Sequence, residues 1–240
     1  MAKLKFDTIK LHIIKFTEQI DSVGNLSKKL PSYALEYSNR FVREEDRGRS
    51  IMTQYFLRKF LSYYLQVDFD KVAISYSKSG KPYLNEKINS NLKFNYSHSG
   101  DYIIYAFTTD KEIGVDIEEI KDISEIDELS RTHFSDEELS IYFELENPDE
   151  KKQLFYKIWT RKEALLKAEG SGITIDLKSL TVLTTNEKKS NQIKVKFLNQ
   201  EWSVSDLFID VNYASSVVIN SDSCKEIFVF DEDFNLLKNL

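Results

Sequence analysis

The 240-residue sequence is poor in the residues that interrupt regular structure, with seven glycines and three prolines. This scarcity excludes collagen-like, proline-rich and glycine/serine-rich architectures and favours helices and strands joined by short turns. The sequence also has one cysteine, Cys224, and three histidines. One cysteine cannot form an intramolecular disulfide, and this set is too small for a conventional structural zinc site, so any bound metal must be held by carboxylate oxygens. Cys224 is interpreted as a small core residue rather than a nucleophile.

The chain has no excess of positive charge, because 33 lysines and arginines face 39 aspartates and glutamates and the net charge is −6. This sign opposes the basic field on which nucleic-acid binding depends, so no nucleic-acid partner is expected. Long apolar runs are missing too: Lys5, Asp7 and Lys10 interrupt the first segment, and no later run approaches the roughly 20 apolar residues of a membrane span. The sequence therefore predicts a cytoplasmic protein with no membrane partner.

What the sequence does contain is an ordinary globular balance, with 41% hydrophobic and 30% charged residues. Apolar residues recur at helical spacing from about residue 47 to residue 66. Asn147 and Gly170 are typical of the N-cap and C-cap of a second long helix. Strand-like alternation separates and follows these helices. This order predicts an α+β fold with two similar halves, residues 1–109 and residues 110–240.

The most specific local feature is the segment Gly114-Val115-Asp116-Ile117-Glu118. In a strand, Asp116 and Glu118 share one face and the apolar residues share the other, and Gly114 would leave the acidic face open to a ligand. The Cα atoms of the two acids would lie roughly 6.6 Å apart, so both side chains could reach one cation such as Mg²⁺. The alternative interpretation is an exposed strand face that carries two solvated acids.

Two further segments combine polar residues at suggestive spacing. Trp159, Glu163 and Lys167 follow one another at intervals of four within the second predicted helix, and Lys162 lies beside that stripe. An ordinary Glu-to-Lys pair beside a core tryptophan would explain the same pattern. The segment FNYSHSG places His98 between two hydroxyls at the end of a strand, where it could bind a phosphate. A single histidine is, however, more often a hydrogen-bonded structural residue.

Taken together, these residues indicate Mg²⁺-dependent phosphoryl-type transfer. Three carboxylates suit Mg²⁺, which binds one or two of them and completes its shell with water and substrate phosphates. Lys162, Lys167 and His98 supply positive donors for a phosphate-rich substrate. The sequence has no Walker loop, kinase glycine loop or dinucleotide-binding fingerprint, so nucleotide-fold kinases and dehydrogenases are disfavoured.

In order along the chain, the motifs resemble those of phosphopantetheinyl transferases of the surfactin-synthetase-activating (Sfp) type. The resemblance covers most of the chain and rests on RGRS followed by FLR, then GKP, FNYSHSG, IGVDIE, FSDEE and WTRKEALLK. Each motif alone is weak, but their order and spacing together are specific. The length is similar to that of the pseudo-dimeric members of the family. It implies a monomer of two α/β halves in a pseudo-twofold arrangement, each a long helix on a small, mainly antiparallel sheet, with the site between them.

The resemblance implies an activity and a set of roles. The enzyme would transfer the phosphopantetheine arm of coenzyme A to a serine of an acyl or peptidyl carrier protein and release adenosine 3′,5′-bisphosphate. Asp116, Glu118 and Glu163 would hold Mg²⁺ on the pyrophosphate. Lys167 would neutralise charge and assist the leaving group, and Glu138 would help to deprotonate the serine. The contacts to coenzyme A would come from Arg49, Lys81, Ser97, His98, Lys162 and Lys167.

One segment departs from the family's pattern. Basic residues often precede the position of Arg49 in the family, but residues 32–38 here read Ser-Tyr-Ala-Leu-Glu-Tyr-Ser. Arg40, Arg43 or the Lys28-Lys29 pair would have to hold the 3′-phosphate of coenzyme A instead. The departure concerns the nucleotide end of the substrate and leaves the metal ligands unaffected.

Two other functions compete with transfer. A non-catalytic module that binds coenzyme A or a carrier protein would keep the scaffold, and a Mg²⁺-dependent phosphohydrolase would keep the acids. The presence of Asp116, Glu118, Glu163 and Lys167 together favours an enzyme. Glu138 has an alternative role as well, because it lies three residues after a serine, which is the spacing of a helix capping box.

Overall fold

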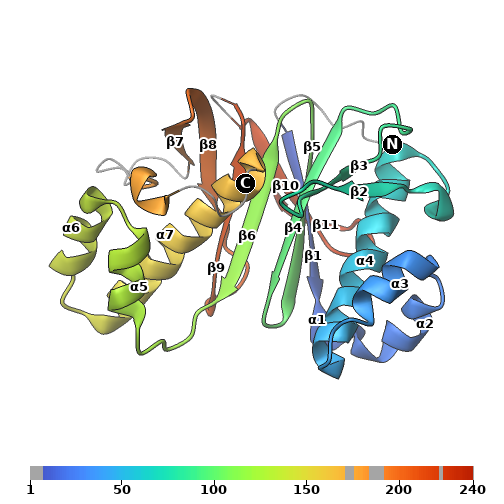
Figure 1. Ribbon diagram of the computed structural model, residues 1–240, viewed down its shortest axis with the longest axis horizontal. Coiled ribbons are helices and arrows are strands. Elements are labelled where there is room, and N and C mark those ends of the chain that lie inside the picture. The colour runs from blue at the N-terminus through green and yellow to red at the C-terminus, as the bar shows by residue number, and fades with distance from the viewer. Residues whose placement is uncertain (1–7, 171–175, 184–191, 222–223, 240) are drawn as a thin grey trace.

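The computed structural model describes residues 8–170, 176–183, 192–221 and 224–239. These residues form two main sheets that pack face to face, and each sheet carries one long helix on its outer face (Figure 1). The layers therefore follow the order helix, sheet, sheet, helix. The predicted α+β class, with two similar helix-and-sheet halves, is confirmed.

The first sheet has five strands, in the spatial order β11 (Leu236–Asn239), β10 (Glu226–Phe230), β1 (Thr8–Lys15), β5 (Tyr102–Thr109) and β4 (Leu92–Ser99). All neighbouring strands are antiparallel except β10 and β1, which run parallel. The helices of this half are α1 (Phe16–Gln19), η1 (Ile20–Ser22), α2 (Val23–Ser27), α3 (Ser32–Ser38), the long α4 (Glu44–Leu65) and η2 (Phe69–Lys71). A short hairpin follows, formed by β2 (Ile74–Tyr76) and β3 (Pro82–Leu84).

The second sheet has four antiparallel strands, in the order β6 (Ile113–Glu119), β9 (Tyr213–Ile219), β8 (Gln200–Asp206) and β7 (Gln192–Phe197). Its helices are α5 (Ile126–His133), α6 (Asp136–Glu144), the long α7 (Pro148–Glu169) and η3 (Leu177–Ser179). None of the helices in the described parts of either half has the length and apolar character that crossing a membrane requires.

The ends of the two long helices follow from local sequence. The Asn147 side chain accepts hydrogen bonds from the first turn of α7, and the helix ends at Gly170 with φ +87°, which a glycine adopts without strain. α4 begins three residues earlier than the predicted start near residue 47. The reason is the acidic run Glu44, Glu45 and Asp46, which suits the positive end of the helix dipole.

Three apolar clusters hold the layers together. Phe56 and Phe60 of α4 pack on the outer face of the first sheet, and Ala164 and Leu165 of α7 pack on the outer face of the second. Between the sheets, the inner faces of both meet in a third cluster: Ile9, Leu11, Ile104, Ala106, Ile113, Val115, Ile117, Leu207, Val217, Ile219, Ile227 and Val229. Cys224 is partly buried against this third cluster, as expected for a small apolar residue. Burial of both faces of each sheet fixes the relative position of the halves.

The division of the chain into halves is less simple than a cut between residues 109 and 110. That position separates β5 from β6, which do belong to different sheets. However, β10 and β11 lie near the end of the chain and return to the first sheet, where β10 pairs with β1. At the centre of the molecule, β4 and β6 are edge strands of the two sheets and lie side by side (Figure 1).

Candidate active site

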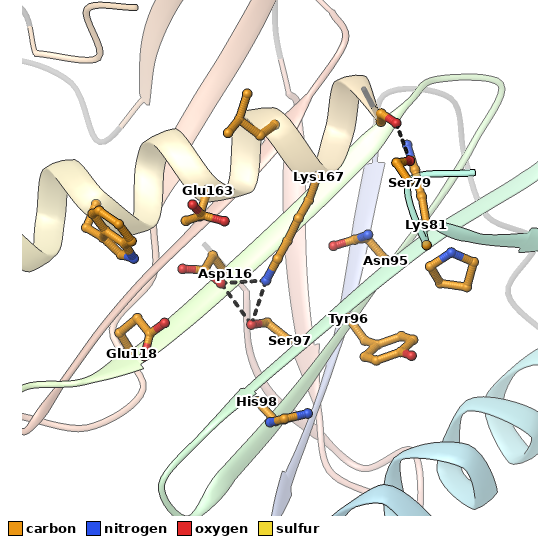
Figure 2. Close-up of a pocket in the computed structure, with 15 residues that line it drawn as sticks. Ser79, Lys81, Asn95, Tyr96, Ser97, His98, Asp116, Glu118, Glu163 and Lys167 are labelled. Atoms are coloured by element: carbon orange, nitrogen blue, oxygen red, sulfur yellow. Dashed lines mark hydrogen bonds and ion pairs between the residues drawn. The ribbon is translucent and has the colours of Figure 1, made fainter. Parts of the chain in front are cut away.

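A cleft of about 550 Å³ opens where the two halves meet. Its walls are β4, β6 and one face of α7, and the turn between β2 and β3 closes one end (Figure 2). The residues that line it are Ser79, Gly80, Lys81, Pro82, Asn95, Tyr96, Ser97, His98, Asp116, Glu118, Trp159, Glu163, Leu166, Lys167 and Gly170. Most of the polar residues that the motifs single out therefore lie in one cleft.

Two acids of β6 face this cleft. Val115 and Ile117 point into the core between the sheets, so Asp116 and Glu118 point the opposite way, as the strand periodicity predicts. Gly114 has a different purpose from the one expected. A Cβ atom there would lie 2.0 Å from the backbone oxygen of Ala164, so this glycine lets α7 pack directly against β6 rather than keeping the face open to a ligand.

α7 contributes the third acid and a base. Glu163 and Lys167 lie one turn apart and face the cleft opposite β6 (Figure 2). Lys167 Nζ donates to Asp116 Oδ1 at 2.6 Å and to Ser97 Oγ at 2.9 Å. Ser97 Oγ in turn donates to Asp116 Oδ1 at 2.9 Å. One oxygen of Asp116 is thus bound from both walls.

The acids of the cleft carry more negative charge than their protein partners neutralise. The pKa of Glu118 and the pKa of Glu163 are both raised, mainly because burial desolvates them and also because Asp116 lies nearby. Asp116 itself is 2% exposed, and its Oδ2 is buried with no hydrogen-bond partner in the described structure. A buried carboxylate oxygen without a partner is costly, and a bound cation would satisfy it.

The three acids of the cleft are the side chains that could bind Mg²⁺. Within residues 8–170, 176–183, 192–221 and 224–239, no three His, Cys, Asp or Glu side chains form a complete metal-ligating cluster. Asp116, Glu118 and Glu163 instead line the cleft separately (Figure 2). Mg²⁺ commonly takes one or two carboxylates and fills its other positions with water and phosphate oxygens. The donor set, with one orphaned carboxylate oxygen, fits that kind of ion.

On the β4 side, His98 also lines a second, smaller pocket of about 100 Å³ together with Arg49 of α4. The pKa of His98 is lowered because its surroundings desolvate it and because Arg49 and Lys167 are nearby, so its imidazole is neutral at neutral pH. The Arg49 guanidinium pairs with Glu45 at 2.7 Å and with Asp46 at 3.3 Å. Its Nε is buried with no partner among the described residues. Arg49 therefore keeps one donor that a ligand could use.

Lys81 lies at the closed end of the cleft, in the turn between β2 and β3. Its Nζ donates to Glu112 Oε2 at 2.8 Å and to the backbone oxygen of Ala168 at 2.6 Å. In the same turn, Ser79 Oγ donates to the backbone oxygen of Gly170 at 2.6 Å. The turn of the first half thus binds the last carbonyl groups of α7.

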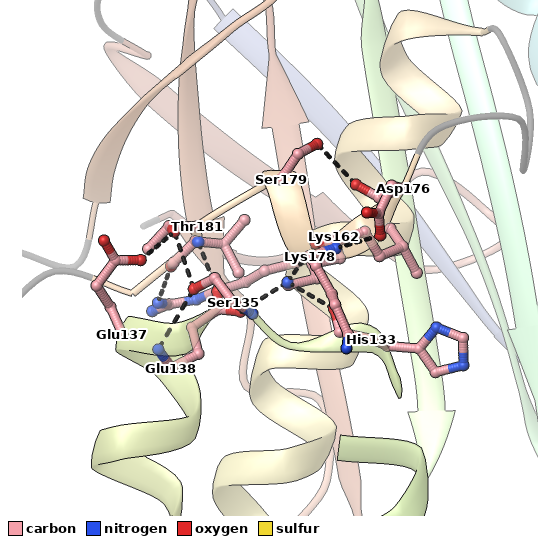
Figure 3. A network of polar contacts seen from close by, with 12 residues as sticks. His133, Ser135, Glu137, Glu138, Lys162, Asp176, Lys178, Ser179 and Thr181 are labelled. Carbon is pink, nitrogen blue, oxygen red and sulfur yellow. Dashed lines mark hydrogen bonds and ion pairs between the residues drawn. The ribbon is translucent and has the colours of Figure 1, made fainter. Parts of the chain in front are cut away.

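Two expected site residues lie elsewhere. Lys162 lies on a different side of α7 from Glu163 and Lys167. There its Nζ donates to Glu138 Oε2 at 2.6 Å and to the backbone oxygens of His133 and Leu177 at 2.9 and 2.8 Å (Figure 3). All three ammonium protons are used, so none is left for a phosphate. Successive residues on a helix differ by about 100° in direction, and Glu163 takes the direction of the cleft.

Glu138 is fully buried beside Lys162 and does not line the cleft. Its Oε2 accepts from the backbone N–H of Ser135 at 3.0 Å, and its Oε1 accepts from that of Val182 at 2.7 Å. The capping box at the start of α6 is formed as its spacing indicates. The structure therefore places neither Glu138 as a base for the serine nor Lys162 as a phosphate partner, and it gives both residues a structural role.

Several cleft residues were not singled out from the sequence. Asn95 and Tyr96 belong to the FNYSHSG motif, and their position next to Ser97 was a usable signal. Pro82 and Leu166 likewise belong to quoted motifs, GKP and WTRKEALLK. Ser79 gave no such signal, because its place in the cleft depends on how the hairpin turn meets the end of α7.

Comparisons with known proteins identify the family of this chain. A family model described as "4′-phosphopantetheinyl transferase superfamily" matches residues 112–218, and one described as "4′-phosphopantetheinyl transferase, N-terminal" matches residues 24–110. The 4′-phosphopantetheinyl transferase HetI of Nostoc sp. is 32% identical over 89% of this chain and 88% of its own length. The transferase Sfp of Bacillus subtilis is 34% identical over 61% of this chain and 63% of its own. The solved holo-[acyl-carrier-protein] synthase of Thermotoga maritima superposes with a TM-score of 0.31 at 12% identity, over 47% of this chain and 64% of that one.

Proposed function

Because the chain belongs to the 4′-phosphopantetheinyl transferase superfamily, we propose that its main cleft transfers the phosphopantetheine arm of coenzyme A to a serine of an acyl or peptidyl carrier protein. One observation carries this proposal: Lys167 of α7 meets Asp116 of β6 at 2.6 Å in a cleft that Glu118 and Glu163 also line. An acidic cluster with one cation is suited to a pyrophosphate that arrives with a divalent metal.

In this proposal Asp116, Glu118 and Glu163 hold Mg²⁺, which when bound would neutralise charge on the pyrophosphate of coenzyme A. The free Oδ2 of Asp116 and the raised pKa values of the two glutamates support this assignment. Asp116 would present Oδ2 while its Oδ1 remains bonded to Ser97 and Lys167. Hydrogen bonds thus hold the carboxylates of Asp116 and Glu118, and binding of the cation would have to bring Glu163 to them.

The chemistry is a displacement at phosphorus. The serine Oγ of the carrier attacks the β-phosphorus, the bond from this phosphorus to the bridging oxygen breaks, and adenosine 3′,5′-bisphosphate leaves with that oxygen. Lys167, which lines the cleft, would stabilise the charge that develops on the leaving group. Glu138 is buried away from the cleft, so in this proposal the serine proton would pass to Glu163, an acid that lines the cleft.

The nucleotide end of coenzyme A would extend along β4 toward the first half. His98 and Lys81 line the cleft on this side, and Arg49 adds an unpartnered guanidinium N–H in the adjoining pocket. Ser97 lines the cleft beside them, with its hydroxyl engaged by Asp116 and Lys167. Under this assignment residues 1–109 supply the nucleotide contacts, and residues 110–240 supply the acids and the face that meets the carrier protein. The four-layer arrangement supports a site between two halves of one chain, and we propose a monomeric, cytoplasmic enzyme.

The direct test is to incubate the protein with coenzyme A, Mg²⁺ and an apo carrier domain and to measure the mass of the carrier. We expect phosphopantetheine addition, none when a chelator is in excess, and strongly slowed addition when Asp116 is replaced by asparagine. Size-exclusion chromatography with light scattering on the same sample tests the monomer.

The two competing functions give different results in this assay. Unmodified carriers from fatty-acid, polyketide and peptide synthesis, with coenzyme A bound but intact, would indicate a binding module. Cleavage of coenzyme A without addition to any carrier would indicate a phosphohydrolase. Full transfer in the presence of excess chelator would contradict the assignment of Mg²⁺ to the three acids, but it would leave the transferase function supported.

A further inference from the structure

The contact between β4 and β6 is unusual, because these edge strands belong to different sheets and yet lie side by side. Neighbouring strands normally share a backbone ladder. Here the described hydrogen bonds between the two strands come from side chains of β4. Three residues of β4 take part, Asn95, Ser97 and Ser99, and they alternate along the strand, so they share one face.

Each of the three residues reaches a defined group of β6. Asn95 Oδ1 accepts from the backbone N–H of Val115 at 3.1 Å. Ser97 Oγ donates to Asp116 Oδ1 at 2.9 Å. Ser99 Oγ donates to Glu118 Oε2 at 2.8 Å and accepts from the backbone N–H of Glu119 at 3.0 Å.

These contacts do two things at once. Residue numbers rise together along β4 and β6. The side chains of Asn95 and Ser99 accept from backbone N–H groups at two points along the edge of β6, which has no strand partner there among the described residues. The two serines bind one oxygen each of Asp116 and Glu118. A carboxylate with one oxygen fixed can rotate less, so its other oxygen has a defined direction.

We propose that Asn95, Ser97 and Ser99 form a side-chain bridge that joins the two halves and orients the carboxylates of Asp116 and Glu118 toward the cleft. The effect of this bridge on metal binding and catalysis rests on the function proposed above. The hydrogen bonds of the bridge are a feature of the fold and do not depend on that function. Ser99 is a positioning residue, because it is absent from the residues that line the cleft and acts through Glu118 and Glu119. Ser97 lines the cleft but is engaged with Asp116 and Lys167.

Hydrogen bonds that orient metal-binding residues commonly change metal affinity by about 10–100-fold when they are removed. We therefore expect Ser99→Ala to weaken Mn²⁺ binding, measured by calorimetry without coenzyme A, by about 10-fold. Ser99→Thr keeps the hydroxyl and should restore the affinity. Ser203→Ala is the matched control, because Ser203 is a strand serine whose hydroxyl bonds a backbone oxygen, that of Ser221, away from the cleft. It should leave Mn²⁺ binding unchanged.

Steady-state kinetics separate orientation from substrate contact. If Ser97 orients Asp116, then Ser97→Ala should lower kcat and leave KM for coenzyme A within about 2-fold. A large rise in KM with kcat unchanged would show that Ser97 serves the nucleotide instead, and it would overturn the proposal for that residue. If Ser99→Ala binds Mn²⁺ as tightly as the wild type does, the proposal that Ser99 orients Glu118 is wrong.

A third measurement does not need the metal or the activity. The free energies of unfolding of Ser99→Ala, Glu118→Gln and the double variant, taken in chelator, form a double-mutant cycle. The bridge predicts that the two changes are not additive. Additive effects would overturn the bridge even if the protein proves to be an active transferase. Coupling in a protein that transfers nothing would support the bridge and contradict the proposed function.

Discussion

Two lysines of α7 form ion pairs of the same length with different surroundings. Lys162 lies 2.6 Å from Glu138, and the two side chains are 1% and 0% exposed; Lys167 lies 2.6 Å from Asp116, and those side chains are 31% and 3% exposed. The buried pair is complete, because both oxygens of Glu138 and all protons of Lys162 have partners. The pair in the cleft leaves Asp116 Oδ2 without one. The incomplete pair, Lys167–Asp116, therefore belongs to the candidate active site, and the complete pair, Lys162–Glu138, stabilises the fold.

The helix itself separates the two roles. Residues 162 and 167 are five positions apart, which turns the second lysine by about 140° relative to the first. Lys162 therefore meets the capped start of α6 and the segment around η3, whereas Lys167 meets β6 and β4 (Figures 2 and 3). The comparison predicts that breaking one pair affects catalysis and breaking the other affects stability.

The largest effect should come from the pair in the cleft. Asp116→Asn removes a charge that the proposed metal requires, so we expect kcat/KM for carrier modification to fall by about 100- to 1,000-fold, with a change in the free energy of unfolding below about 1 kcal/mol. Carrier mass spectrometry and urea denaturation measure the two quantities. Near-normal turnover in this variant would contradict the assignment of Asp116 as a ligand.

Breaking the buried pair should give the opposite result. Lys162→Met leaves the Glu138 carboxylate buried without its cation, which should cost about 3–5 kcal/mol of stability. The double variant Lys162→Met/Glu138→Gln should regain part of that loss, because no buried charge remains. Turnover per folded molecule should stay within a few-fold of the wild type. A stable Lys162→Met variant with a large loss of kcat would instead place Lys162 in the chemistry.

The two glutamates beside the incomplete pair predict a pH dependence. The pKa values of Glu118 and Glu163 are raised, so the folded protein holds these protons more tightly than the unfolded chain. Without divalent metal, their contribution to the free energy of unfolding should therefore decrease as pH rises from about 4.5 through the raised pKa values. Excess Mg²⁺ should reverse this trend, because it binds the deprotonated acids.

Thermal melts between about pH 5 and about pH 8, with chelator and with Mg²⁺, test this prediction. Burial lowers the pKa of His12 to about 4, which makes stability rise with pH in both conditions, so the difference between the two series isolates the acids. Glu118→Gln/Glu163→Gln should remove that difference. A difference that persists in the double variant would assign the metal effect to other residues.

The smallest effect concerns the turn that binds the end of α7. Lys81 and Lys93 both pair with Glu112, at 2.8 and 2.6 Å, but only Lys81 also bonds Ala168 and lines the cleft. Lys81→Met should raise KM for coenzyme A a few-fold and change stability by less than about 1 kcal/mol, as expected for a partly exposed pair. Lys93→Met is the matched control and should leave KM unchanged. If both variants changed KM equally, the effect would come from the loss of an ion pair with Glu112 and not from a contact between Lys81 and coenzyme A.

Local sequence predicted the features that depend on local geometry. Strand alternation placed Asp116 and Glu118 on one face, and the helical stripe placed Glu163 and Lys167 on one side of α7. The limits lie in tertiary contacts. The stripe did not distinguish Lys162 from its neighbours, because partners as distant in sequence as His133 and Glu138 decide where its ammonium group lies.

Gly114 and the pairing of β1 with β10 also depend on tertiary contacts that local sequence does not reveal. Gly114 was read as an opening for ligand, but its missing Cβ serves the approach of α7, which depends on the packing of two elements 50 residues apart. The pairing of β1 with β10 could not be predicted from alternation, since a strand pattern does not specify its neighbour.

That pairing has a consequence for how the molecule is made. β1 begins at Thr8 and its parallel partner β10 begins at Glu226, so a ribosome must synthesise every residue between these two strands before the first sheet can close. Contacts between such distant segments form late, because the intervening loop is entropically expensive to close. A nascent chain that already contains β1, β4 and β5 still exposes one edge of β1, and that edge stays unpaired until β10 has been synthesised.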